Sequence, residues 1–295
     1  MLQLKKNRKK RVYLDYNIYI DSINPKKEKN ILKLISMTQP YISVSHIEEY
    51  YNACECAKLS EKSTEYMENN EKIKTIMIRD IKGILNPTET VIKNKPETFD
   101  ECLERIRIFD TRNVVKEHGK NLYEEYNVNI EELDIKIPDN NYPSYSDIWE
   151  TEQVKNELSI FPQYLSLYKD ACFKNLNKSY GFYIAMQQVK KMKLSNIELT
   201  FNYFKTKTPN FSELELIIEF LHNVLNKCNY YTDETQKTCT SGIHDVSHSI
   251  YGTYCDYFIT QDIRLIKKLK AIYYYLGIDT KVLSLKEALN MLSLK

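Results

Sequence analysis

The chain has 295 residues, of which 42% are hydrophobic and 28% are charged. This length suffices for one large domain, or for a domain with a substantial insertion, so a core can form without disulfide bonds. No stretch reaches the roughly 20 apolar residues that a membrane span requires. The basic N-terminal run leads into a strand-like segment and not into the apolar core of a secretory signal. We therefore expect a cytoplasmic protein with no membrane partner.

The formal net charge is only +2, which does not indicate a nucleic-acid partner, since net charge says nothing about local patches. The seven cysteines are an odd number without regular spacing, a pattern that favours free thiols in a reducing compartment. Cys54 and Cys56 stand one residue apart in a predicted helix, so their sulfurs point in different directions. A zinc ion shared by these two cysteines is not expected.

The N-terminal block alternates strands and helices. The run RVYLDYN predicts a buried strand at Val12–Asp15 whose carboxyl end leads into a loop. Apolar residues at helical spacing predict a helix over 27–37, which Pro40 closes. Tyr41–Ser45 is the second predicted strand. Ser45 is then expected to cap the long helix that follows.

The C-terminal block repeats this alternation. The pattern predicts helices at His244–Tyr254 and Gln261–Tyr275, with Gly277 ending the second of them. It predicts strands at Asp256–Thr260 and Thr280–Ser284. Apolar strands that alternate with helices indicate an α/β layered fold, so we expect a mainly parallel sheet built from both ends of the chain.

Residues 60–240 are expected to form a large helical insertion packed on one side of the sheet. Apolar residues recur there at three- and four-residue spacing, and no segment shows the two-residue alternation of a strand. A loop rich in Pro, Asn, Asp and Ser over 138–147 divides the insertion into two halves. The predicted helices are Glu61–Leu85, Glu97–His118, Ser146–Tyr168, Tyr180–Lys191 and Phe211–Cys228.

Two acids stand where the predicted strands end. Asp15 closes the first strand, and Asp262 follows the strand that ends at Thr260. Ligands of open α/β sheets bind outside the carboxyl ends of the strands, so acids at these places carry more functional weight than acids elsewhere. Taken singly, each of the two is more simply explained as a residue that caps a turn or a helix.

Further acids lie on the helices beside these strands. Asp245 precedes His248 by three residues, which places both on one face of a helix. Glu48 and Glu49 are adjacent on the helix after the second strand, where one should lean towards the sheet and the other towards water.

The chain carries four blocks that together resemble the PIN-like nuclease family: VYLDYN, SVSHIEEY, HDVSHSIYGTYCDYFITQD and KVLS. In that family three or four acids gather at the carboxyl edge of a parallel sheet and hold Mg²⁺ or Mn²⁺. The resemblance implies a PIN-like three-layer α/β fold. Its discontinuous nuclease core would comprise residues 1–59 and 241–295, and the helical insertion would comprise residues 60–240.

The resemblance also assigns the acids. Asp15 is similar to the first family acid and Glu49 to the second, with Glu48 as the alternative to Glu49. Asp245 is similar to the third and Asp262 to the fourth. These four carboxylates are then expected to be both the catalytic residues and the ligands of Mg²⁺ or Mn²⁺. Clustered carboxylates would repel one another without a cation, so the set makes physical sense as a metal site.

Polar and basic residues near these acids are candidates for substrate binding. His248 is expected either to support a metal ligand or phosphate or to be a packed structural histidine. Basic residues on the helix after Asp262 would form a stripe beside the metal, and the run 5–11 would form another phosphate-contacting arm. Asp256 precedes its strand, at the end away from the metal cluster, and is expected to be structural or to support a metal ligand from behind. The substrate-binding candidates are Asn17, Ser45, His248, Thr260, Arg264, Lys267 and Lys268.

The function expected from these features is cleavage of single-stranded RNA by an endoribonuclease in a toxin-like, defence or RNA-processing role. The ion would activate a water and stabilise charge on the leaving oxygen. The insertion would gate substrate or dock a regulatory protein. Two alternatives remain open at this point: a structure-specific DNA nuclease, which uses the same chemistry, and a catalytically inactive PIN-like module that binds a protein partner.

Overall fold

The computed structural model describes residues 9–79, 84–85, 97–108, 117, 120–121, 124, 142–174, 197–232 and 235–293. The chain divides into two compact units, each discontinuous in sequence. The first comprises 1–117, 247–266 and 279–295, and the second comprises 118–246 and 267–278. Residues 60–117 therefore belong to the same unit as the N-terminal strands.

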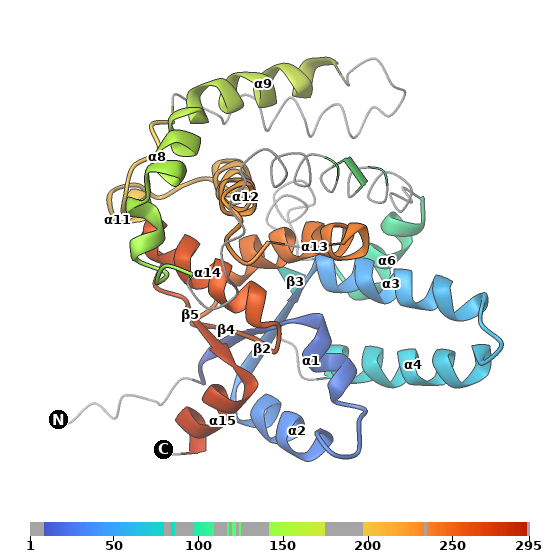
Figure 1. The fold of residues 1–295 in the computed structure, drawn as a ribbon. Coiled ribbons are helices and arrows are strands. Elements are labelled where there is room, and N and C mark those ends of the chain that lie inside the picture. The colour runs from blue at the N-terminus through green and yellow to red at the C-terminus, as the bar shows by residue number, and fades with distance from the viewer. Residues whose placement is uncertain are drawn as a thin grey trace. The chain divides into compact units, whose positions relative to one another are not determined.

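A parallel β-sheet forms the centre of the first unit (Figure 1). Its four longer strands are β1 (Arg11–Leu14), β2 (Gln39–Ser43), β4 (Tyr257–Thr260) and β5 (Lys281–Ser284). The two-residue strand β3 (Ile84–Leu85) pairs in parallel with β2, and the strand order is β3-β2-β1-β4-β5. The predicted α/β class, with a parallel sheet built from both ends of the chain, is confirmed.

Two sequence-based assignments around this sheet were wrong. The second strand spans Gln39–Ser43 and not Tyr41–Ser45. It ends at Ser43 because the Ser43 N–H donates to His46 Nδ1 at 3.0 Å and helix α3 (Val44–Lys58) starts at once. The helix predicted to run to Leu85 ends at Arg79, and Leu85 lies in β3. A strand of two residues is too short to show an alternating pattern, so periodicity could not predict it.

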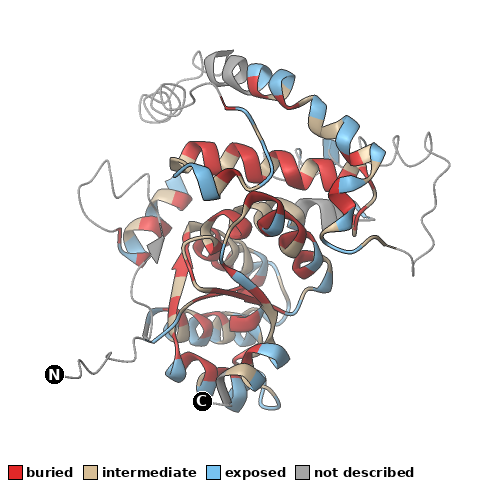
Figure 2. Ribbon diagram, turned by 90° about the vertical axis from the view of Figure 1, so that its left-hand side faces the viewer, coloured by how far each residue is buried: buried red, intermediate tan, exposed pale blue. Residues whose placement is uncertain are grey.

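One face of the sheet shares a continuous core with six helices of the first unit. Side chains alternate along a strand, and the residues at one parity of β1, β2 and β4 belong to the same core as residues of α1, α2, α3, α4, α6 and α15. Most of the strand residues are buried (Figure 2). The strand members of this core are Val12, Leu14, Ile42, Tyr257 and Ile259. The helices are α1 (Tyr16–Asp21), α2 (Glu28–Met37), α3, α4 (Ser63–Arg79), α6 (Phe99–Ile108) and α15 (Leu285–Ser293).

The opposite parity of the same strands carries the polar residues. Tyr13 stacks on Phe258 with ring centroids 5.3 Å apart, and its hydroxyl lies 2.6 Å from Ser43 Oγ. Asp15 follows Tyr13 by two residues and is hydrogen-bonded to Thr260. One face of the sheet is therefore apolar, and the other gathers hydroxyl and carboxyl groups at three strands.

The described part of the second unit is helical. Its elements are η1 (Asp147–Glu150), α8 (Glu152–Ser159), α9 (Phe161–Lys174), α11 (Tyr203–Thr206) and α12 (Phe211–Lys227). The predicted helix at Phe211–Cys228 is confirmed as α12, and Asn210 and Glu213 cap it by reciprocal side-chain to backbone bonds. The helix predicted at Ser146–Tyr168 is three separate elements instead. The helix predicted at Tyr180–Lys191 lies outside the described residues.

Two helices cross the boundary between the units in sequence: α13 (Gln236–Gly252) and α14 (Ile263–Leu276). Gly277 follows α14 with φ of 70°, and the Ile278 N–H donates to the Tyr273 carbonyl at 2.9 Å. This is the helix end that the sequence predicts at Gly277. Across the described residues, the helices are too short or too polar to span a membrane.

Candidate active site

The carboxylate of Asp15 is buried where β1 ends. The residue is 2% exposed, and its N–H continues the sheet ladder by donating to the Ile259 carbonyl at 2.9 Å. Thr260 Oγ1 donates to Asp15 Oδ2 at 2.6 Å, and Asn17 Nδ2 lies 3.5 Å from the same oxygen. Asp15 and Thr260 meet because β1 and β4 are parallel neighbours whose carboxyl ends share one edge.

The charge of Asp15 is opposed by its surroundings. Burial raises the pKa of Asp15 above its ordinary value, and the nearby charge of Glu49 raises it further. His248 and the Thr260 hydroxyl act in the opposite direction without cancelling these effects. An additional positive charge next to Asp15 would therefore be stabilising.

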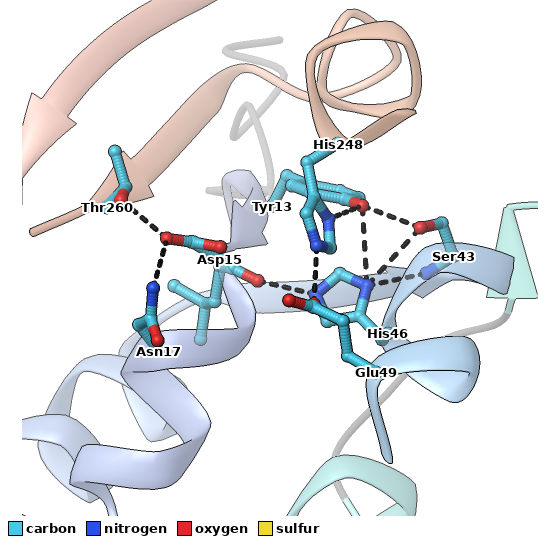
Figure 3. Close-up of polar contacts among 9 residues, drawn as sticks. Tyr13, Asp15, Asn17, Ser43, His46, Glu49, His248 and Thr260 are labelled. Atoms are coloured by element: carbon cyan, nitrogen blue, oxygen red, sulfur yellow. Dashed lines mark hydrogen bonds and ion pairs between the residues drawn. The ribbon is translucent and has the colours of Figure 1, made fainter. Parts of the chain in front are cut away.

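Glu49 is held beside this carboxylate by a histidine that is distant in sequence. His248 Nε2 on α13 lies 2.7 Å from Glu49 Oε2 on α3. The His248 side chain is 1% exposed and that of Glu49 is 25% exposed, so the pair reaches from the interior towards solvent. Figure 3 shows Asp15, Glu49 and His248 grouped at the same edge of the sheet.

Tyr13 connects this pair to two further buried side chains. Its hydroxyl lies 2.7 Å from His248 Nδ1, 2.6 Å from Ser43 Oγ and 3.3 Å from His46 Nδ1 (Figure 3). His46 Nε2 in turn lies 2.6 Å from the Leu14 carbonyl oxygen. Burial lowers the pKa of His46 well below its ordinary value, so this ring is neutral.

Glu48 has a different environment from Glu49. Burial raises the pKa of Glu48 to about 7, although the positive charge of Arg105 on α6 acts in the opposite direction. Arg105 itself makes two hydrogen bonds, at 3.1 and 3.2 Å, to the buried carboxylate of Glu97. Of the two adjacent glutamates, Glu49 is the one hydrogen-bonded to His248 beside Asp15.

The other two acids that the sequence predicts as metal ligands are Asp262 and Asp245. Asp262 Oδ1 accepts the N–H groups of Arg264 and Leu265 at 2.7 and 3.1 Å, so it caps the N-terminus of α14. Asp245 is half-buried on α13 and belongs by sequence to the second unit. The convergence of all four acids on one metal ion remains a prediction.

Asp256 has the structural role that its position before β4 predicts. It accepts hydrogen bonds from the backbone N–H of Arg11 at 2.9 Å and from the Arg11 guanidinium at 3.2 Å. Partial burial by itself would raise the pKa of Asp256, but the hydrogen bonds and charge of Arg11 outweigh it and hold the pKa below the ordinary value.

The donor set is compatible with a hydrated divalent ion that has few protein ligands. Among the described residues, no three His, Cys, Asp or Glu side chains are grouped so that they hold a metal ion together. Mg²⁺ keeps several waters and is commonly bound through only one or two carboxylates. Asp15 and Glu49 supply two carboxylates whose charges influence each other, a pair that suits such an ion.

The predicted substrate-binding residues divide into three that reach the surface and four that are buried. The three at the surface are Asn17, Lys267 and the half-buried Arg264, and Lys267 Nζ lies 5.9 Å from the centre of the Tyr231 ring. Of the four buried residues, Ser45 is 1% exposed and Lys268 is 5% exposed. The remaining two candidates, Thr260 and His248, are buried and hydrogen-bonded to the proposed ligands Asp15 and Glu49.

The prediction of an exposed basic stripe that includes Lys268 was wrong. Lys268 stands three residues after Leu265 and four before Ile272, and both of these are buried. Helical geometry therefore places Lys268 on the packed face of α14. Ser45 was misplaced for a related reason, because the helix starts at Val44 and turns Ser45 inward.

Sequence analysis missed Tyr13, Ser43 and His46. The available signal was parity, since Tyr13 stands two residues before Asp15 in a strand and must share its face. A tyrosine in an apolar run is more simply explained as a core residue, so the hydrogen bonds of its hydroxyl were not predicted.

No protein-family model, curated protein or solved structure matches this chain.

Proposed function

We propose that this chain is a metal-dependent endonuclease of the PIN-like type that cleaves single-stranded RNA. One observation carries the proposal: the buried carboxylate of Asp15 lies with Glu49 at the carboxyl edge of a parallel sheet. That edge is where open α/β sheets bind ligands. The resemblance of the sequence blocks to PIN-like nucleases supplies the reaction class and the preference for RNA.

In this proposal, Asp15 and Glu49 hold Mg²⁺ or Mn²⁺ together with water. Held by these two carboxylates, the ion would lower the pKa of a water and would stabilise negative charge on the leaving oxygen. Thr260 keeps one oxygen of Asp15 occupied, and His248 does the same for Glu49. Each carboxylate is thereby oriented before the ion arrives, and no protein nucleophile is required.

Asn17 and Arg264 are the surface groups that we assign to the phosphate backbone. Asn17 adjoins Asp15 and is exposed, and Arg264 stands two residues after Asp262 at the start of α14. An amide and a guanidinium both donate to phosphate oxygens without reading the base. Their loss is expected to weaken binding of every sequence similarly.

A catalytically inactive module of the same fold is the second candidate. It is favoured by the engagement of the predicted ligands in protein contacts: Glu49 bonds to His248, and Asp262 caps α14. Such a module would dock a protein partner and would bind no divalent ion. Metal binding therefore separates the two candidates before any substrate is known.

The test combines cleavage and metal binding. Purified protein is incubated with labelled single-stranded RNA and DNA in Mn²⁺, Mg²⁺ or EDTA, and Mn²⁺ binding is measured by calorimetry. Asp15→Asn is expected to abolish cleavage and to weaken Mn²⁺ binding at least tenfold. The control is Asp100→Asn, the same change at an aspartate with an 80% exposed side chain on α6, which should leave both unchanged. Cleavage by the Asp15→Asn protein at the normal rate would reject the assignment.

A further inference from the structure

We infer that Tyr13 and His248 are positioning residues that fix the carboxylate of Glu49 through a buried chain of hydrogen bonds. This inference deepens the proposed function and rests on it, because Glu49 is there a ligand of the ion. The chain starts at the Leu14 carbonyl, passes through His46, Ser43, Tyr13 and His248, and ends at Glu49 (Figure 3).

The directions of the hydrogen bonds at the two ends of the chain follow from the groups that make them. A carbonyl oxygen only accepts, so His46 Nε2 carries the proton that is donated to Leu14, and the neutral ring leaves Nδ1 as an acceptor. That nitrogen accepts the Ser43 N–H at 3.0 Å. His46 is therefore fixed in one tautomer by backbone groups at both of its nitrogens.

The proton at the Glu49 end of His248 is fixed in the same way. Its Nε2 lies 2.7 Å from an oxygen of Glu49, and an ionised carboxylate only accepts, so Nε2 carries a proton. Nδ1 lies 2.7 Å from the Tyr13 hydroxyl, which donates to a neutral ring and accepts from a protonated one. Ser43 Oγ, 2.6 Å from the phenolic oxygen, completes the sequence in either state.

Ring packing fixes the orientation of the Tyr13 side chain. The centroid of its ring lies 5.3 Å from that of Phe258, on which it stacks, and 4.9 and 5.6 Å from those of His46 and His248, which it meets edge to face. The Tyr13 hydroxyl is therefore held in one direction. His248 is anchored by Tyr13 at one nitrogen and holds Glu49 with the other. Carboxylates that bind metals are themselves commonly hydrogen-bonded by supporting residues, which orient them.

Tyr13 on β1 therefore sets the position of the Glu49 carboxylate on α3 through the His248 ring on α13. Glu49 is partly exposed, and a glutamate at such a place samples several rotamers unless one oxygen is held. Removing the Tyr13 hydroxyl should leave His248 Nδ1 without this anchor, let the imidazole ring turn and leave Glu49 in more than one position, without removing a charged group from the site.

Three variants test the inference. Tyr13→Phe removes the hydroxyl and keeps the ring. His248→Gln places an amide near the former Nε2 and retains a donor for Glu49, whereas His248→Asn is too short to reach it. The matched control is Tyr41→Phe, the same change at the residue that pairs with Tyr13 in β2 and whose hydroxyl accepts only from Gln39 among the bonds described.

The readouts are the order of the His248 ring and of the Glu49 side chain in crystals of each variant, and Mn²⁺ affinity by calorimetry. We expect Tyr13→Phe to lose the single orientation of the His248 ring, to disorder Glu49 and to weaken Mn²⁺ binding about tenfold. His248→Gln should bind Mn²⁺ more tightly than His248→Asn. Tyr41→Phe should match the wild type in all three, and thermal unfolding identifies any variant that has lost its fold.

The outcomes separate this inference from the proposed function. A single Glu49 conformer and an unchanged His248 ring orientation in Tyr13→Phe would overturn the positioning role, whatever the protein does with metal. A wild-type protein that binds no Mn²⁺ would overturn the proposed function, and the ring orientation and Glu49 conformer would then still decide whether Tyr13 orients Glu49. Equal Mn²⁺ affinity in His248→Gln and His248→Asn would count against the donor to Glu49.

Discussion

Replacing Glu48 with Gln should stabilise the first unit at neutral and alkaline pH. Burial raises the pKa of Glu48 from 4.5 to about 7, so the fold disfavours the ionised carboxylate. A difference of one in pKa corresponds to about 1.4 kcal/mol, so the full penalty at pH 8 is on the order of 3 kcal/mol. An amide has nearly the same shape and carries no charge to desolvate.

The sign of the pH dependence follows from the raised pKa. Below about pH 4.5 the carboxyl is protonated in both the folded and the unfolded chain, so the wild type and the Glu48→Gln protein should be equally stable. As pH rises through 7, the unfolded chain gains from ionisation that the folded chain resists. The stability advantage of the Glu48→Gln protein should therefore grow between these two values and then level off.

Hydrogen exchange of the α3 and β1 amides is the appropriate assay. The one tryptophan, Trp149, lies in the second unit, so its fluorescence would not report on the first. Exchange free energies are compared at about pH 5, 6.5 and 8 after correction for intrinsic rates. The control is Glu104→Gln, with a 64% exposed side chain, which should show no comparable trend. An advantage that is independent of pH, or a Glu48→Gln protein that is less stable at pH 8, would refute the reasoning.

Three further changes test other parts of the site. Without metal, Asp15→Asn should raise the thermal midpoint at pH 7, because the pKa of Asp15 is raised by burial; this gain should disappear below the ordinary pKa of 3.8. Asp262→Ala removes the cap of α14 and should lower the free energy of unfolding by about 1 kcal/mol in denaturant titrations, and no loss would exclude the capping role. Asp256→Asn breaks a half-exposed ion pair with Arg11 and should cost at most about 1 kcal/mol. Because the pKa of Asp256 is lowered in the fold, that cost should be present at pH 7 and fade as pH falls below 3.8; a cost that persists at about pH 2.5 would contradict it.

Local periodicity identified the elements that bury one face. The strands near Tyr13 and Phe258 are short apolar runs, and the mostly buried helix α12 has apolar residues at helical spacing and a capping box, so both were predictable from sequence. Gly277 ended α14 as predicted because its φ of 70° favours a residue without a side chain. The boundary error at Leu85 arose from pairing with β2, a partner that the local pattern does not contain. The error at Ser43 arose from a capping bond to His46, a partner only three residues away.

The candidate acids were predictable for a similar reason. Asp15 directly follows a buried strand, and the carboxyl ends of parallel strands meet at one edge, so its proximity to Thr260 follows from topology. The choice between Glu48 and Glu49 did not follow. Adjacent residues on a helix differ by about 100° in direction, and which direction faces the sheet depends on how the whole helix is rotated.

Sequence alone therefore determined the α/β class, the strands at both ends of the chain and the acids at the strand ends, because each depends on a short local pattern. Only the tertiary structure decided that Glu49 meets His248 across 199 positions of sequence and that Tyr13 joins them. It also decided that Lys268 is buried. These facts depend on which elements pack together, and a hydrogen bond between distant segments leaves no periodic trace in either of them.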